Sequence, residues 1–156
     1  MKDFHDTCSL KASDMMCSHV ITLSPDDTLE RTLQTLLEKK ISGAPVTDPE
    51  NRVVGVISEY ALMDLLFDPE LKTAPVSSHM STDTVTVHED DPATKLAHLF
   101  VLYRIRRLPV VRDERLVGIV SRRDLLRRFA ESEYAVPEPL YESPTIDFDD
   151  VVLEES

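Results

Sequence analysis

Residues 105–126 read IRRLPVVRDERLVGIVSRRDLL, and residues 41–62 read ISGAPVTDPENRVVGVISEYAL. The two stretches align over their whole length, with Pro45 opposite Pro109 (64 positions apart) and Gly55 opposite Gly118 (63 positions apart). The deletion that changes the offset falls between them in a turn-rich segment, where a change of length costs little. The chain therefore contains an internal repeat.

The sequence on either side of these stretches repeats as well. In each copy a short β-branched run comes first, leucines at helical spacing follow, and a second helical pattern closes the copy. Each copy is predicted to be a β-α-β-β-α unit, which gives a fold class of α/β (α+β type). Because so small a unit exposes one face of its sheet, the two units are expected to pack sheet to sheet. The predicted elements are strands at 20–23 and 84–87, first helices at 29–37 and 96–102, and second helices at 59–67 and 122–129.

This repeat divides the chain into five segments. An N-terminal leader covers residues 1–11, the first unit 12–68 and a linker 69–75. The second unit covers residues 76–130, and residues 131–156 form an acidic, proline-containing tail.

The composition limits the classes of protein that the chain can belong to. Its 156 residues carry a net charge of −12, which argues against a general affinity for nucleic acid or for anionic membranes. No apolar run approaches the roughly 20 residues of a membrane span, and residues 1–6 lack a signal-peptide pattern. Cys8 and Cys17 have no metal-type spacing and are expected to be free thiols in a reducing cytoplasm.

The basic residues are distributed unevenly. Nine of the eleven arginines lie between Arg104 and Arg128, whereas residues 131–156 carry nine acids and no lysine or arginine. The plain interpretation is that many of these arginines are solvated on helix surfaces, among them Arg112, Arg115, Arg127 and Arg128. A second expectation is that the acidic tail docks on this arginine-rich surface.

The ordered motifs of both copies resemble the CBS (cystathionine-β-synthase-type) domain, over about residues 12–130. This resemblance implies two CBS units associated through their sheets around a pseudo-twofold axis. It also implies clefts between the units for AMP, ADP, ATP or S-adenosylmethionine, and pairing of two chains into a flat homodimer. Modules of this kind resemble the regulatory parts of channels, transporters, kinases and metabolic enzymes.

The resemblance assigns a ligand-binding role to the run from Gly118 to Asp124. Gly118 would let a ligand approach the backbone, and Ser121 would donate to a phosphate or cap the helix that begins at Arg122. That helix start also offers free N–H groups to an anion. Asp124 would accept from the ribose hydroxyls; the alternative is that it only favours the helix N-terminus electrostatically.

The complete site implied by the resemblance combines residues of both units. Val20, Ile41 and Ile119 would sandwich the adenine, and Ser42 and Gly43 would leave room for the purine. Arg106, Arg107 and Arg123 would contact the phosphates, because several guanidinium groups offset the repulsion between a phosphate and an acidic protein. The predicted binding residues are Ser18, Val20, Ile41, Ser42, Gly43, Arg106, Ile119, Ser121, Arg123 and Asp124.

The equivalent run of the first copy departs from the pattern. Ala61 stands where the ribose-binding aspartate is expected, and Glu59 adds negative charge where phosphate would lie. This cleft also receives Arg106 and Arg107 in place of Ser42 and Gly43. We therefore expect one competent site and one empty or weak site in each chain.

The sequence offers no catalytic or metal-binding constellation. The histidines are scattered, and three glycines in total are too few for a phosphate-binding loop. The leading hypothesis is a non-catalytic sensor, without a catalytic cofactor, that binds an adenine nucleotide and signals to a separate protein partner. The alternatives are a ligand-free dimerisation scaffold and a module that binds S-adenosylmethionine.

Overall fold

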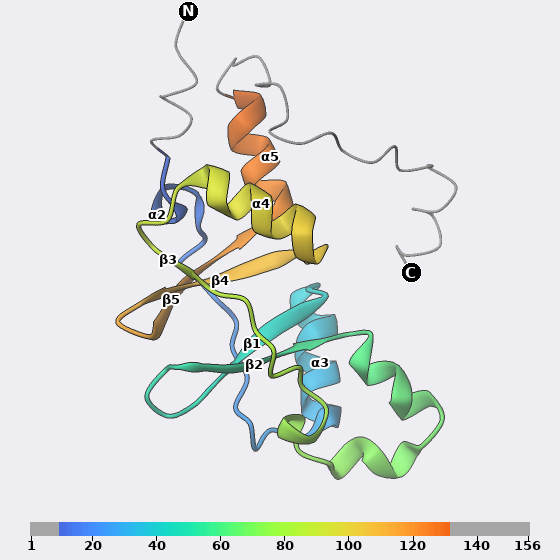
Figure 1. Cartoon of the computed structure of the whole chain (residues 1–156). Coiled ribbons are helices and arrows are strands. Elements are labelled where there is room, and N and C mark those ends of the chain that lie inside the picture. Colours follow the sequence, from blue (N-terminus) through green and yellow to red (C-terminus); the bar gives the residue numbers. More distant parts are fainter. Residues whose placement is uncertain (1–9, 132–156) are drawn as a thin grey trace, which may run out of the picture.

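The computed structural model describes residues 10–131, which form two small β-sheets with helices packed against them (Figure 1). This mixed α/β architecture confirms the predicted fold class. The elements, with η for 3₁₀-helices, are α2 (Ala12–Met15), α3 (Leu29–Lys39), β1 (Gly43–Thr47), β2 (Val53–Ser58), η1 (Ala61–Leu66), η2 (Pro69–Thr73), η3 (Val76–Ser78), β3 (Val87–His88), α4 (Ala93–Tyr103), β4 (Arg107–Arg112), β5 (Arg115–Ser121) and α5 (Arg122–Glu131).

Each unit is built on one antiparallel hairpin, and the two hairpins share their register. Pro45 of β1 lies opposite Val56 of β2, and Pro109 of β4 lies opposite Ile119 of β5. In both hairpins the register shifts directly after the valine that follows the proline. The repeat in the sequence is therefore a repeat of the backbone.

The predicted first strands are much shorter than expected. Of residues 84–87, only Val87 lies in a strand, β3, which pairs in parallel with β4. Of residues 20–23, only Leu23 pairs, through an isolated parallel bridge to Val46. The first two residues of each run, Val20 and Ile21 or Thr84 and Val85, line clefts instead of extending the sheets.

The second helices of the two units differ. The helix predicted at 122–129 is confirmed as α5, whereas the segment 59–67 forms the short 3₁₀-helix η1. In α5 the carboxylate of Asp124 accepts from the backbone N–H of Ser121, and Ala61 at the corresponding position of η1 has no such group. The missing cap gives a physical reason why the first unit lacks a regular α-helix here.

The first helices end in the same way in both units. Lys40 after α3 and Arg104 after α4 have left-handed backbone conformations, with φ of 55° and 52°. Such a C-cap turns the chain sharply from the helix toward the next strand. It therefore positions Ile41 and Ile105 between helix and strand, at the clefts described below.

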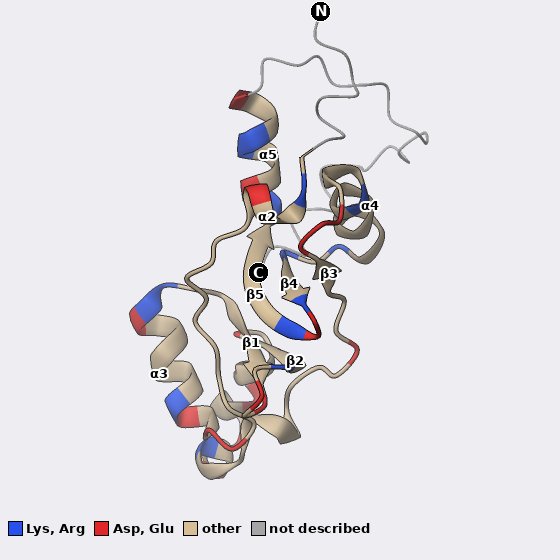
Figure 2. Ribbon diagram, turned by 90° about the vertical axis from the view of Figure 1, so that its left-hand side faces the viewer, with Lys and Arg blue, Asp and Glu red and all other residues tan. Residues whose placement is uncertain are grey.

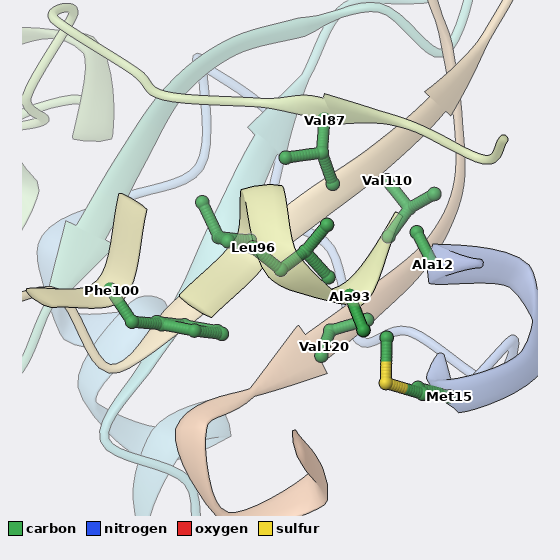
Figure 3. Packing of buried hydrophobic residues seen from close by; sticks show 9 residues of the cluster. Ala12, Met15, Val87, Ala93, Leu96, Phe100, Val110 and Val120 are labelled. Carbon is green, nitrogen blue, oxygen red and sulfur yellow. The ribbon is translucent and has the colours of Figure 1, made fainter. Parts of the chain in front are cut away.

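The two units exchange their leading segments. Helix α2 precedes the first unit, yet Ala12 and Met15 are buried in the hydrophobic core of the second, against β4, β5 and α4 (Figure 3). Val76 of η3 belongs in turn to the core of the first unit. Two antiparallel bridges, Cys17 to Ile119 and Val56 to Ser81, attach these segments to the other unit's hairpin. The cores are therefore interlocked.

The arginine-rich segment lies largely on the surface. Arg122, Arg123, Arg127 and Arg128 of α5 are exposed, and Arg112 pairs with Glu89 at 3.1 Å. Figure 2 shows basic positions along α5. Within residues 10–131, no helix combines the length and the apolar character needed to cross a membrane. The predicted docking of the acidic tail cannot be followed, because all of its residues after Glu131 lie outside the described residues.

Candidate functional site

One cleft of about 380 Å³ brings together most of the binding residues predicted from the sequence, and we name it the Asp124 cleft. It lies between the start of β1 in the first unit and the β5–α5 junction in the second. Residues far apart in the chain thus share one cleft between the units. Its lining consists of the predicted Val20, Ile41, Ser42, Gly43, Ile119, Ser121 and Asp124, together with Cys17, His19, Ile21, Lys40, Pro45 and Arg107.

Three predicted residues lie outside this lining. Ser18 is exposed between two lining residues, and Arg106 lines the neighbouring cleft instead. Arg123 is exposed on α5 because successive helix residues point about 100° apart, so only one of Arg123 and Asp124 can face the cleft. Lys40 also lines the cleft, and the sequence analysis did not predict it as a binding residue. The signal that could have identified it is a basic residue between the helical leucines and Ile41.

The β5–α5 junction is held by a reciprocal pair of hydrogen bonds. The backbone N–H of Ser121 donates to Asp124 Oδ2 at 2.8 Å, and the backbone N–H of Asp124 donates to Ser121 Oγ at 3.0 Å. These two bonds form a capping box. Asp124 therefore stabilises the start of α5, which is the structural role that the sequence left open as the alternative to ribose binding. No donor within residues 10–131 bonds its other oxygen, Oδ1, and the residue is half-buried at the cleft.

Arg107 occupies the space that the sequence assigned to a purine. Its Nη2 donates to Ser42 Oγ, and its Nη1 lies where a side chain of residue 43 would begin. A purine at the predicted place against Ser42 and Gly43 therefore requires this guanidinium to move, and the roles of Ser42 and Gly43 stay predictions. Burial lowers the pKa of Arg107, the charge of Arg106 adds to this effect, and Glu59 opposes it.

Gly118 has a packing role that the sequence did not predict. A Cβ at this position would overlap the side chain of Met16, and a Cβ at Gly55 would overlap that of Met80. Neither glycine has positive φ, so each provides space and not a turn. The space at Gly118 receives a methionine from the exchanged segment, and the close approach of a ligand to Gly118 stays a prediction.

A second cleft, of about 410 Å³, occupies the related position in the other half of the repeat, and we name it the Glu59 cleft. It contains three arginines and two acidic side chains, whereas Ala61 is absent from its lining. Ser42 and Arg107 line both clefts. The lining consists of Ser42, Val56, Ser58, Glu59, Tyr60, Ser81, Asp83, Thr84, Val85, Arg104, Ile105, Arg106, Arg107 and Pro109.

Among the described residues, Ser78, His79 and Asp64 lie close together, as in a catalytic triad. Ser78 Oγ lies 2.8 Å from His79 Nδ1, and His79 Nε2 lies 3.9 Å from Asp64 Oδ2. The Ser78 hydroxyl, however, donates to the carbonyl of Pro75 at 2.7 Å, so its proton does not point to the imidazole. This geometry does not activate a nucleophile. Within residues 10–131, no group of three potential metal ligands is present either.

The two interlocked α/β units and their two related clefts define a tandem module. Comparisons with known proteins identify the family to which this module belongs. The CBS domain model matches residues 12–68 and again residues 76–131. The chain therefore belongs to the CBS domain family, which confirms the resemblance seen in the sequence.

Solved structures of similar fold include CBS domain pairs with bound ligands. The CBS domain pair of protein MJ0100, in complex with 5′-methylthioadenosine and S-adenosyl-L-methionine, is 26% identical with a TM-score of 0.70. CBSX2 in complex with AMP is 28% identical with a TM-score of 0.71. Each comparison covers 80% of this chain and 98% of the other.

Curated relatives include enzymes that are much longer than this chain. Inosine-5′-monophosphate dehydrogenase of Methanocaldococcus jannaschii is 38% identical over 119 residues, which are 76% of this chain and 23% of that protein. The A-adding tRNA nucleotidyltransferase of Geobacter sulfurreducens is 33% identical over 131 residues, 84% of this chain and 15% of that protein. The chain thus spans less than a quarter of either enzyme.

Proposed function

We propose that the chain is a regulatory CBS pair that binds an adenine nucleotide (AMP, ADP or ATP) in the Asp124 cleft and signals to a separate protein. The observation that carries this proposal is the convergence of Val20 and Ile41 from one unit with Ile119 and Asp124 from the other. These residues lie far apart in the chain and line one cleft.

The chemistry of the cleft suits an adenosine group. Val20, Ile41 and Ile119 are half-buried apolar residues that can enclose a base. Asp124 Oδ1 can accept hydrogen bonds from ribose hydroxyls while Oδ2 continues to cap α5. Lys40 supplies a positive charge at the same cleft for a phosphate.

The ligands of the related structures support adenosine as the common feature. AMP is bound by CBSX2, and 5′-methylthioadenosine and S-adenosyl-L-methionine are bound by the MJ0100 domain pair. S-Adenosylmethionine is therefore the alternative ligand for this chain.

The test is thermal unfolding of the full chain with AMP, ADP, ATP or S-adenosylmethionine. A ligand at about 100 times its Kd should raise the Tm by roughly 5–10 °C. Asp124→Asn should abolish the shift, because it removes the charge while an amide oxygen can still cap α5. Asp14→Asn is the matched control, because Asp14 has the same capping-box contact to Lys11 in α2 but lies in neither cleft. The absence of any shift would contradict the proposal.

We further propose that the chain forms a homodimer through exposed apolar side chains. Tyr60, Leu66 and Phe67, in and beside η1, are 78%, 72% and 86% exposed, and Leu102 near the end of α4 is 70% exposed. Residues of this size left in water favour association. Light scattering after gel filtration should report two chains, and Phe67→Glu should shift the protein toward the monomer. A wild-type monomer at micromolar concentration would contradict this.

One observation favours a ligand-free scaffold as the second candidate. The guanidinium of Arg107 fills the purine space of the Asp124 cleft in the conformation described. A scaffold predicts that the protein dimerises and that no adenosine compound changes its Tm.

We do not propose an enzymatic activity. We place the protein in a reducing cytoplasm, where the exposed free thiol of Cys17 would persist.

A further inference from the structure

Arg107 and Ser42 stand apart from the other lining residues because they line both clefts. Arg107 begins β4, and the residue at the same position of the repeat is Gly43, which begins β1. The larger side chain of one unit thus extends over the glycine of the other. This contact is one of the points at which the two halves of the repeat differ.

The contact lies in the lining of the Asp124 cleft. The Arg107 guanidinium is held by Ser42 Oγ and fills the volume above Gly43. Two atoms cannot share this volume, so a purine that lies against Ser42 and Gly43 requires the guanidinium to move.

The Glu59 cleft offers a second position for the same guanidinium. Glu59 lies beside Ser42, because its backbone N–H donates to the carbonyl of Ser42 at 2.9 Å. Arg107 and Glu59 line this cleft together, and the charge of Glu59 attracts Arg107 while Arg106 repels it. A rotation of the Arg107 side chain toward Glu59 would exchange a neutral hydroxyl partner for a carboxylate.

We propose that Arg107 is a gate that sets the affinity of the Asp124 cleft: its guanidinium leaves Ser42 and Gly43 when an adenosine group enters, and moves to Glu59. This inference rests on the proposed function and adds its regulation. The movement transfers one positive charge from the Asp124 cleft to the Glu59 cleft. Occupation of one cleft thereby changes the electrostatic potential of the other.

The test is calorimetric titration of the full chain with adenosine and, separately, with AMP. Arg107→Gly reproduces the residue found at the equivalent position of the repeat and removes the gate. It should bind adenosine roughly tenfold more tightly than wild type, which is the effect expected when one hydrogen bond to a charged group need not be broken. Ser42→Ala removes only the anchor and should change the affinity in the same direction by a smaller factor.

Glu59→Gln tests the second position. It removes the charge that receives the guanidinium, so adenosine should bind more weakly than to wild type. In the Arg107→Gly background the same substitution should have no effect, because the residue that it attracts is absent. Arg112→Gly is the matched control, since it removes an arginine at the other end of β4, outside both clefts, and should leave adenosine affinity unchanged.

The possible results separate the gate from the other roles of Arg107. If Arg107→Gly weakens AMP binding and leaves adenosine unchanged, Arg107 is a phosphate contact and the gate is overturned. If Arg107→Gly lowers the Tm of the free protein and does not tighten adenosine binding, its role is structural and the gate is again overturned. If neither wild type nor Arg107→Gly binds any adenosine compound, the proposed function and the gate both fail. If only Arg107→Gly binds, the gate is supported.

Discussion

The two halves of the molecule have nearly the same backbone and different chemistry. Both have a hairpin with the same register, a left-handed residue after the first helix, and a glycine that receives a methionine from the exchanged segment. The second half has Asp124 at its cleft and a regular helix α5, whereas the first has Ala61 and the 3₁₀-helix η1.

The difference shows which parts of the repeat serve the fold and which serve the site. Features present in both halves, such as the contacts of Gly55 with Met80 and of Gly118 with Met16, hold the interlocked cores together. Features present in one half only, namely Asp124 and Arg107, lie at the clefts. Substitutions at equivalent positions can therefore separate stability from binding.

The largest expected effect comes from the buried position that is apolar in one half and polar in the other. Leu96 and Thr32 occupy equivalent positions and are both 0% exposed. Leu96→Ala should lower the free energy of unfolding by about 2–5 kcal/mol because it leaves a cavity. Thr32→Ala should cost about 1 kcal/mol, mainly for the hydroxyl that bonds the carbonyl of Thr28 at 2.9 Å. Urea denaturation measures both, and equal costs would contradict the packing described.

A smaller and symmetrical effect is expected at the two glycines. Gly118→Ala and Gly55→Ala should each cost about 1–3 kcal/mol, because the new methyl group displaces Met16 or Met80. Combining Gly118→Ala with Met16→Ala should cost less than the sum of the single substitutions, since the two residues share one space. A purely additive result in urea denaturation would show that the methionine does not occupy this space.

The smallest expected effect is a gain in stability. Ala61→Asp would place a carboxylate three residues after Ser58 and so restore the capping box found at Ser121 and Asp124. We expect about 1 kcal/mol of additional stability and more helical signal in far-ultraviolet circular dichroism. Ala61→Ser is the control for the added polarity. Unchanged helicity would mean that the missing cap is not the reason for the 3₁₀ geometry of η1.

Most of the fold could be predicted, because the helices and strands of each copy follow from the local spacing of residue types. Pro45 and Pro109 marked the hairpins, and the spacing of Leu29 and Leu36 marked α3. The exchange of leading segments could not be predicted, since burial of Ala12 in the other unit's core is a long-range contact without local signal. The strand at 20–23 was overestimated because β-branched residues also suit the apolar wall of a cleft.

The candidate site was predicted less completely, because it too depends on contacts between residues that lie far apart in the chain. Asp124 and Ile119 belong to a motif whose spacing fixes their directions, and both line the cleft. The direction of a long side chain is not fixed by its position in the sequence, so the contact of Arg107 with Ser42 could not be foreseen. The contact of Gly118 with Met16 could not be predicted either, because a glycine indicates close approach without showing which group approaches.

The central claim is that the two clefts differ and that only the Asp124 cleft binds an adenine nucleotide. The most direct measurement is the binding stoichiometry from calorimetric titration of AMP into the full chain and its Asp124→Asn and Asp14→Asn variants. We predict one AMP per chain for wild type and Asp14→Asn, and none for Asp124→Asn. Two AMP molecules per chain, or one that remains bound to Asp124→Asn with unchanged affinity, would contradict the claim.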